Sequence, residues 1–359
     1  MPADIPLIRE MSAYNNDIMS KRSKILSIAL HILTVSSCAT YKGQSVSLTS
    51  TPYEALTQPS PALLSSPTKE FTSPEHIDIG GGRFITYTPT EIDLVDPIQG
   101  TTSKIKSFQE PLNLIALSPD GNRLAYLLNN SVLIEDIASH SINDLVENQI
   151  GSVGRRMGWS PDGSMIVLTC ATPSHPTSEI CLVNATNGDV RTVTNSKELG
   201  ISNPYDFVGF ESWNHEGSAI AFTLNRTPPY GGEEKNDIYF LDLITGKINL
   251  IVTSETQSNI LSIGWLSIAP DDKTILFHGK INGNFQIFQI NIDGSGLRQI
   301  TDETGYDVTN PVWNPNGTLF SGFLSSPHGQ LPGQAVIFDL SGRIVHRLDT
   351  SGFVMQWLK

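Results

Sequence analysis

Short runs of alternating apolar and polar residues fill the chain from residue 76 onward. A period of two places successive side chains on opposite faces of the backbone, which is the pattern of β-strands with one buried face. Such a strand runs into an acidic or polar residue six times: Ile92–Asp96, Val132–Asp136, Ile180–Asn184, Ile238–Asp242, Ile287–Asn291 and Ala335–Asp339. The pattern predicts six similar units of β-structure.

A tight turn recurs ahead of these strands. Its clearest members are Ser118–Gly121, Ser160–Gly163, Asn214–Gly217, Ala269–Asp272 and Asn314–Gly317. In the last one, Pro315 presets φ for the turn and Gly317 tolerates a positive φ. With Gly82 as the first member, the turns recur about every 40 to 55 residues, which is typical of propeller blades of four strands.

The first unit lacks an inner strand of its own. The apolar segment Phe353–Leu358 supplies one, and its Trp357 aligns with Trp159, Trp265 and Trp313 of other units. Pairing this segment with the first blade closes the ring and removes a free sheet edge. We therefore predict an all-β fold, a six-bladed β-propeller of four-stranded blades over residues 76–359, closed by its C-terminal strand.

Composition and charge narrow the classes of partner. Aromatic residues make up only 8% of the chain and charged residues 16%, whereas Gly (29) and Pro (22) are plentiful, as suits short strands joined by turns. The formal net charge of −13 argues against a nucleic-acid partner, which needs a basic face. We expect a monomer.

The N-terminal region has the features of an export signal. Lys21, Arg22 and Lys24 precede an apolar run, Ile25–Val35, that is too short to span a bilayer but suits a signal peptide. The small residues before Cys38 resemble a bacterial lipobox, in which the cysteine is lipidated; the alternative is a short buried helix with an incidental cysteine. We predict a signal region over residues 1–37, in which the signal peptide itself starts at Met19, and we predict lipidation of Cys38.

Residues 39–75 are rich in Ser, Thr and Pro and have almost no apolar periodicity. Such a segment cannot bury enough surface to fold, so we expect residues 38–75 to be a lipidated cysteine followed by a disordered tether. The chain is then exported and held at a bacterial membrane through the lipid anchor alone, on the outer leaflet of the cell membrane or in the periplasm or outer membrane.

Two stretches resemble the Pro-Asp-Gly repeat of the TolB-type six-bladed β-propeller family. They are Trp159–Gly163 and Gln289–Thr301, the second of which runs on toward Trp313. The resemblance covers about residues 76–359 and implies a fold more than a function, because propellers serve as binding modules, lyases and accessory domains of hydrolases. The lipobox and the lack of an expected N-terminal α/β domain are departures from TolB.

Candidate catalytic and metal sites are few. The carboxylates of Asp120 and Asp162 suit catalysis or calcium binding, but an aspartate in such a turn ordinarily caps backbone N–H groups. The loop at Asp293 lacks the further ligands of a calcium site. Histidines show no metal-binding spacing, and there is no Gly-x-Ser-x-Gly elbow. We predict no catalytic residue, no metal and no cofactor.

Two cysteines flank the segment Ala171–Ile180, which we expect to be a loop between the second and third strands of the third blade. Facing residues of neighbouring antiparallel strands lie at a Cα separation that suits a disulfide, and an exported protein meets oxidising conditions. We predict a bridge between Cys170 and Cys181; the alternative is two separate buried thiols.

The longer loops all fall on one face of the predicted ring, where second-to-third strand turns and blade-to-blade links lie. Binding sites usually occupy elaborated loops on a rigid scaffold. The candidate binding residues there are Arg155, Arg156, Tyr205, Asp206, Tyr230, Glu233, Tyr306 and Asp307, for which the alternative is ordinary solvated loop residues. We predict a non-enzymatic scaffold that binds a protein or peptide at the cell envelope; the alternative is a glycan lyase or hydrolase with a polar or metal site in the central funnel.

Overall fold

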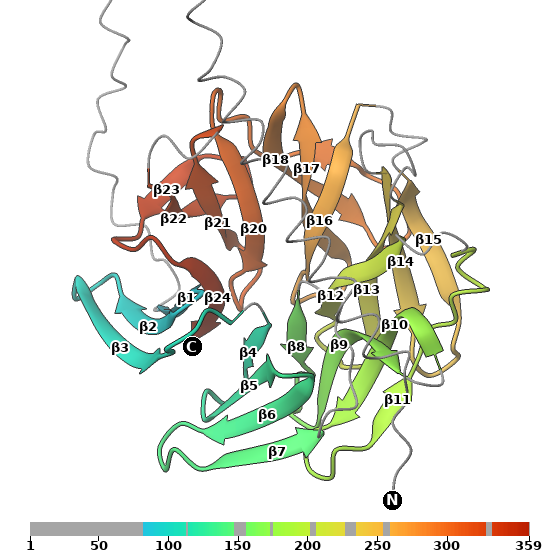
Figure 1. Ribbon diagram of the computed structural model, residues 1–359. Coiled ribbons are helices and arrows are strands. Elements are labelled where there is room, and N and C mark those ends of the chain that lie inside the picture. Colours follow the sequence, from blue (N-terminus) through green and yellow to red (C-terminus); the bar gives the residue numbers. More distant parts are fainter. Residues whose placement is uncertain are drawn as a thin grey trace, which may run out of the picture. The chain divides into compact units, whose positions relative to one another are not determined.

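The computed structural model describes residues 82–112, 114–146, 156–172, 175–201, 206–226, 235–253, 259–327 and 332–358. All of them belong to one compact unit of the chain. They form six four-stranded antiparallel sheets arranged as the blades of a β-propeller (Figure 1), which confirms the predicted fold class. The predicted signal region, Cys38 and the tether lie outside the described residues.

The blades are numbered in the order of the chain, and the C-terminal strand β24 belongs to blade one. Blade one contains β24 (Phe353–Leu358), β1 (Arg83–Thr88), β2 (Glu91–Asp96) and β3 (Thr101–Ser107). Blade two contains β4 (Ile115–Leu117), β5 (Arg123–Leu128), β6 (Ser131–Asp136) and β7 (Ile142–Val146). Blade three contains β8 (Met157–Trp159), β9 (Met165–Thr172), β10 (His175–Asn184) and β11 (Val190–Thr192).

The other three blades follow the same order from the inner strand outward. Blade four contains β12 (Phe207–Trp213), β13 (Ala219–Arg226), β14 (Lys235–Asp242) and β15 (Ile248–Thr253). Blade five contains β16 (Leu261–Ile268), β17 (Thr274–Ile281), β18 (Asn284–Asn291) and β19 (Arg298–Gln299). Blade six contains β20 (Asp307–Trp313), β21 (Leu319–Ser325), β22 (Gln334–Asp339) and β23 (Ile344–Arg347). Among the described residues, no helix is long and apolar enough to cross a bilayer.

The C-terminal strand β24 closes the ring by pairing antiparallel with β1. Trp357 lies opposite Phe84, and their rings meet edge to face with centroids 4.5 Å apart. Phe84 is fully buried and Trp357 is 6% exposed. The strand therefore contributes a large apolar side chain to the core of blade one as well as its backbone hydrogen bonds.

A tryptophan at the end of an inner strand joins each of several blades to the preceding one. Its indole Nε1–H donates to a backbone carbonyl of the neighbouring inner strand: Trp159 to Ala116 (3.1 Å), Trp213 to Gly158 (3.3 Å) and Trp313 to Ser267 (3.1 Å). In each case the acceptor directly precedes the last residue of its own strand. These bonds satisfy a buried donor and fix the spacing between blades.

The closing strand makes the same connection through one extra hydroxyl. Trp357 Nε1 donates to Ser321 Oγ at 3.2 Å, and Ser321 Oγ donates to the carbonyl of Val312 at 3.4 Å. Val312 holds the place in β20 that Ala116, Gly158 and Ser267 hold in the other inner strands. The seam between blades six and one thus repeats, through Ser321, the contact that the tryptophans of blades three, four and six make.

The alignment of Trp265 with these tryptophans was wrong. In blade five the last position of the inner strand is Ile268, which pairs with Ile275 as Trp313 pairs with Phe320. Trp265 lies three residues earlier in the same strand. The tryptophan missing from the alignment is Trp213, which pairs with Ile220 in blade four.

The recurring turn is held by its own side chains. Asn314 Oδ1 accepts from the backbone N–H groups of Thr318 (2.9 Å) and Leu319 (3.0 Å), and Gly317 adopts a φ of 71°. In blade three, Asp162 accepts from Ser160 Oγ, and this bond holds the pKa of the carboxyl below its usual range. Asp162 and its counterpart Asp120, which accepts from Ser118 Oγ, therefore stabilise turns.

The turn of blade five replaces the glycine with Asp272 at a φ of 57°. A non-glycine residue is strained in this region, so other interactions must compensate. The Asp272 carboxylate accepts from the backbone N–H groups of His215 (2.6 Å) and Glu216 (3.2 Å) in the turn of blade four. The substitution joins two neighbouring turns across a blade boundary.

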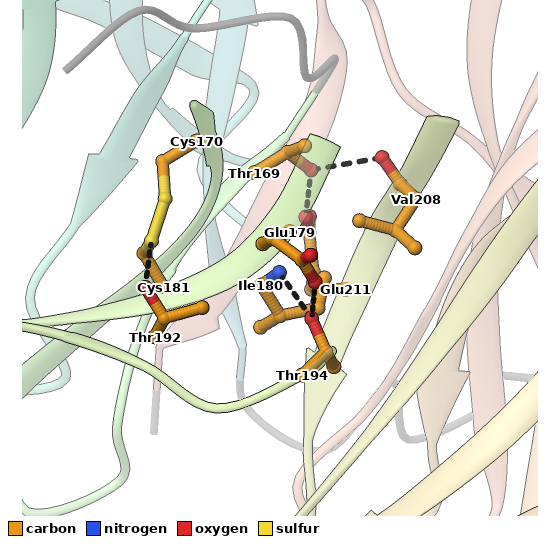
Figure 2. The surroundings of a disulfide bond; sticks show 9 residues. All are labelled: Thr169, Cys170, Glu179, Ile180, Cys181, Thr192, Thr194, Val208 and Glu211. Atoms are coloured by element: carbon orange, nitrogen blue, oxygen red, sulfur yellow. Dashed lines mark hydrogen bonds between the residues drawn. A yellow bond between two sulfur atoms is a disulfide. The ribbon is translucent and has the colours of Figure 1, made fainter. Parts of the chain in front are cut away.

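Cys170 and Cys181 form a disulfide between β9 and β10, with their Cα atoms 5.9 Å apart (Figure 2). The predicted loop between them is largely strand, because β9 runs to Thr172 and β10 begins at His175. The cysteines are diagonal and not directly opposite, since Cys170 pairs with Glu179 and Cys181 with Leu168. Both are at most 1% exposed.

One buried histidine makes stability depend on pH. His278 in β17 is buried and lies against Phe285, and burial lowers its pKa from 6.5 to about 3. Below pH 6.5 the unfolded chain binds this proton and the folded protein does not, so the stability falls as the pH falls. Between pH 7 and pH 5 we expect His278 to remove about 2 kcal/mol of unfolding free energy.

Urea unfolding of the wild type and His278→Gln at both pH values measures this contribution. The variant should lose less stability than the wild type between pH 7 and pH 5, by about that amount. Equal losses in the two proteins would show that His278 titrates alike in the folded and unfolded chains.

Candidate functional site

The structure tells where four of the eight candidate binding residues lie. Arg155, Tyr205, Tyr230 and Glu233 fall outside the described residues. The other four are Arg156, which precedes β8, Asp206, which precedes β12, Tyr306, which precedes β20, and Asp307, the first residue of β20. Their binding role remains a prediction, but their contacts separate them into two groups.

Asp206 is engaged within the protein. It is 9% exposed, and its Oδ2 lies 3.9 Å from Arg226 Nη1. Arg226 Nε also lies 3.5 Å from Asp237 Oδ2, and its Nη2 donates to the carbonyl of Leu199 at 3.3 Å. This cluster ties the segment that links blades three and four to β13, which is a structural task.

Asp307 is also engaged within the protein. Its Oδ1 accepts from the backbone N–H of Phe285 at 2.8 Å and so holds the hairpin between β17 and β18. Tyr306 is 37% exposed, and its carbonyl accepts from Gln286 Nε2 at 3.0 Å. By strand register Asp206 corresponds to Tyr306 and not to Asp307, so the two Tyr-Asp pairs are offset by one residue.

Arg156, which directly precedes the inner strand of blade three, contacts the inner strand of blade five. Its Nη1 donates to the carbonyl of Leu266 at 2.5 Å, and its guanidinium lies 5.7 Å from the ring centroid of Trp265. Arg156 belongs to blade three, whereas both contacts belong to β16 of blade five. Because the inner strands surround the axis of the ring (Figure 1), a contact that skips blade four must run close to that axis.

Bulges in the inner strands shape this region. One extra residue interrupts the pairing of β12 between Gly209 and Ser212, of β16 between Gly264 and Ser267, and of β20 between Thr309 and Val312. In the last two, the residue that follows the paired position has a positive φ: 51° at Trp265 and 55° at Asn310. Bulges re-aim side chains, and strained backbone of this kind is concentrated at functional sites.

The bulge of β12 contains a buried carboxylate, Glu211, which is 2% exposed. Thr169 Oγ1 donates to its Oε1, and Figure 2 shows this bond beside the contact of Thr169 with the Val208 carbonyl. The second oxygen, Oε2, is buried and has no hydrogen-bond partner among the described residues. Burial raises the pKa of Glu211, and the bond from Thr169 and the charge of Arg156 counter that rise.

Arg156, Trp265 and Glu211 define what we call the axis site. Arg156 and Trp265 are half-buried, so both keep contact with solvent. Burial lowers the pKa of Arg156, and the nearby Glu211 carboxylate counters this effect. Among the described residues Arg156 has no ion-pair partner within 4 Å. The site therefore offers a cation, an aromatic face and a buried acceptor from three consecutive blades.

Sequence reasoning found one member of the axis site and missed two. Arg156 was a candidate, but Glu211 was passed over and Trp265 was assigned to the blade core. The available signal for Glu211 was an acidic residue within the otherwise apolar and small inner strand Phe207–Trp213. In the described part of the chain, no group of three or more His, Cys, Asp or Glu side chains is arranged to hold a metal ion.

The repeated blades and turns agree with a known family of propellers. Residues 95–356 match the TolB beta propeller domain. The chain belongs to this family. The match covers most of the described propeller, including both the recurring turns and the axis site.

Similar proteins are distant in sequence. An uncharacterized protein of Agrobacterium fabrum is 26% identical over 203 residues, which are 56% of this chain and 61% of the relative. The tricorn protease of Thermoplasma acidophilum is 26% identical over 242 residues, which are 64% of this chain and 21% of that protein. This TolB-family chain therefore spans less than two thirds of either curated relative.

A solved structure supports the same fold. The crystal structure of TolB from Acinetobacter baumannii superimposes with a TM-score of 0.56 at 19% identity, covering 78% of this chain and 67% of that one. At this identity the likeness shows the propeller fold of the TolB-family chain and leaves its ligand to be argued from the site itself.

Proposed function

We propose that this TolB-family propeller is a non-enzymatic scaffold that binds a protein or peptide at the bacterial cell envelope, to which the lipidated Cys38 holds it. The observation that carries the proposal is the axis site. It places Arg156, which has no ion-pair partner within 4 Å among the described residues, and the half-buried Trp265 on a rigid ring. Arginine and tryptophan are the residues most enriched where proteins bind other proteins.

The surrounding architecture suits recognition of a macromolecule. The inner strands fix the axis site, and the sequence has longer segments between several strands, which is where binding sites on a rigid scaffold usually lie. The net charge of −13 makes a nucleic-acid partner unfavourable and leaves proteins and peptides as the natural class. The enzyme alternative, a glycan lyase or hydrolase, has no specific observation in its favour among the described residues.

Cross-linking of the full chain in its own membrane tests the proposal. The chain carries an affinity tag, and cross-linked partners are quantified for the wild type and for a variant in which residues 227–234 are replaced by a short Gly-Ser linker. We expect at least a ten-fold loss of the main partner in the variant. A matched control, Ile244→Ser, changes an exposed residue in the turn after β14 and should leave capture intact.

Two outcomes count against the proposal. Equal capture by the wild type and by the variant lacking residues 227–234 would show that this loop is not needed for binding, which contradicts a partner bound on the face with the longer loops. The proposal also requires a Cys38→Ala variant to appear in the soluble envelope fraction. If this variant stays in the membrane fraction, lipidation of Cys38 does not hold the protein there.

A further inference from the structure

The axis site combines two groups whose hydrogen-bonding capacity is only partly used. A guanidinium has five N–H donors, and Arg156 uses one of them for the Leu266 carbonyl. A carboxylate has two acceptor oxygens, and Glu211 Oε2 is buried and accepts no hydrogen bond from the part of the chain that the structure describes. Such an orphaned buried acceptor costs about 1–3 kcal/mol or more unless something satisfies it.

The two groups are neighbours but do not pair with each other. Thr169, whose hydroxyl donates to Glu211, lies in β9, and β9 pairs with β8, the strand that begins directly after Arg156. The charge of each group also shifts the pKa of the other. They nevertheless lie farther apart than an ion pair, because no contact within 4 Å joins them. A ligand that carries both an anionic acceptor and an N–H donor would satisfy the unused donors of Arg156 and the unused acceptor of Glu211 together.

We propose that the axis site binds a carboxylate flanked by an N–H donor, as found at the free C-terminus of a peptide. This inference rests on the proposed binding function and names the chemistry that the site recognises. The ligand carboxylate takes the free N–H groups of Arg156, and the adjacent amide N–H donates to Glu211 Oε2.

The arginine favours a carboxylate for geometric reasons. The planar guanidinium matches the two oxygens of a carboxylate and forms paired, charge-assisted hydrogen bonds with them. The Leu266 carbonyl and the ring of Trp265 hold the guanidinium in place, so little side-chain entropy is lost when the ligand binds. The half-buried setting strengthens the interaction compared with an arginine in water.

The glutamate selects among anions. A phosphate group also suits an arginine, but its higher negative charge meets the Glu211 carboxylate at close range. A simple carboxylate avoids part of that repulsion but leaves Oε2 unsatisfied. A carboxylate with an adjacent N–H satisfies both protein groups, so it should bind more tightly than either of the other two classes.

Three small probes separate these contributions on the wild-type full chain. N-acetylalanine has the carboxylate and the N–H, propionate has only the carboxylate, and N-acetylalanine amide has only N–H groups. Ligand-observed NMR titration gives their dissociation constants in the millimolar range. We expect N-acetylalanine to bind at least ten-fold more tightly than the amide and several-fold more tightly than propionate.

Variants assign the binding to the named residues. Arg156→Gln should raise the dissociation constant of N-acetylalanine at least ten-fold. Glu211→Gln should reduce the difference in affinity between N-acetylalanine and propionate. Arg343→Gln is the matched control, because Arg343 is an exposed arginine paired with Asp339 on the outer part of blade six. It should bind all three probes as the wild type does.

The source of the carboxylate is settled by a fourth probe, N-acetylaspartate α-amide, which carries it on a side chain. Binding of this probe as tightly as N-acetylalanine would assign the site to acidic side chains in place of chain ends, and would overturn the C-terminal form of the proposal.

Equal binding of the acid and the amide, or unchanged binding by Arg156→Gln, would overturn the proposal as a whole. The probe comparison uses only the wild-type chain, so it decides the matter even if a variant does not fold. The two experiments can fail independently. Cross-linking that succeeds without probe binding contradicts this inference alone, and probe binding without a cross-linked partner contradicts the proposed function alone.

Discussion

Removal of residues 352–359 should lower the melting temperature by more than about 10 °C or prevent stable folding. The deletion takes β24 from blade one and exposes the edge of β1 together with the core side of Phe84. Burial of Trp357 alone is worth about 4–6 kcal/mol at roughly 25 cal/mol per Å² of its side-chain surface. This is comparable with the whole stability of an ordinary domain, about 5–15 kcal/mol.

Thermal unfolding followed by circular dichroism measures the effect of this deletion. Trp357→Phe is the matched variant: it keeps the strand and most of the apolar contact but removes the indole donor to Ser321. It should cost about 1–3 kcal/mol, much less than the deletion, because only one buried hydrogen bond is lost. A truncated chain that melts with the wild type would contradict closure of the ring by β24.

Reduction of the disulfide between Cys170 and Cys181 should lower the unfolding free energy by about 3 kcal/mol. The bridge closes a short loop, with a sequence separation of 11, and restricts the unfolded chain by a corresponding entropy. The bridge also lies in the core directly after Thr169, which donates to Glu211 of blade four, so blade three should loosen before the others.

Urea unfolding of oxidised and reduced protein gives this difference. The double variant Cys170→Ala/Cys181→Ala should resemble the reduced wild type and should not change further when reductant is added. Counting of free thiols in unfolded protein adds an independent measurement: two more thiols should appear after reduction. The same number before and after reduction would show that no bridge exists.

The sequence was sufficient for the ring because each blade repeats local chemistry. The Asn314–Gly317 turn and its relatives specify tight hairpins through nearby residues alone, and the polar residue that ends each third strand gives a second landmark. The closing role of Phe353–Leu358 could be predicted by counting strands, because the first blade lacked an inner strand and this segment followed the last complete blade. Such features depend on contacts within or between neighbouring strands.

The axis site could not be predicted in the same way. A bulge shifts the pairing by one residue without any clear signature in the residue types, so Trp265 was aligned with tryptophans that end their strands. Whether Arg156 meets Leu266 depends on the curvature of three blades, and these residues are 110 positions apart. Whether Glu211 Oε2 finds a partner depends on the same distant geometry.

The closing strand has a consequence for how the protein is made. On one side β1 pairs with β2 and on the other with β24, and nearly the whole propeller is synthesised between β1 and β24. During synthesis the first blade therefore exposes a strand edge that can pair with another chain, and local folding cannot cover it. We expect the emerging chain to need either a chaperone at residues 83–88 or slow folding of blade one until residues 353–358 have left the ribosome.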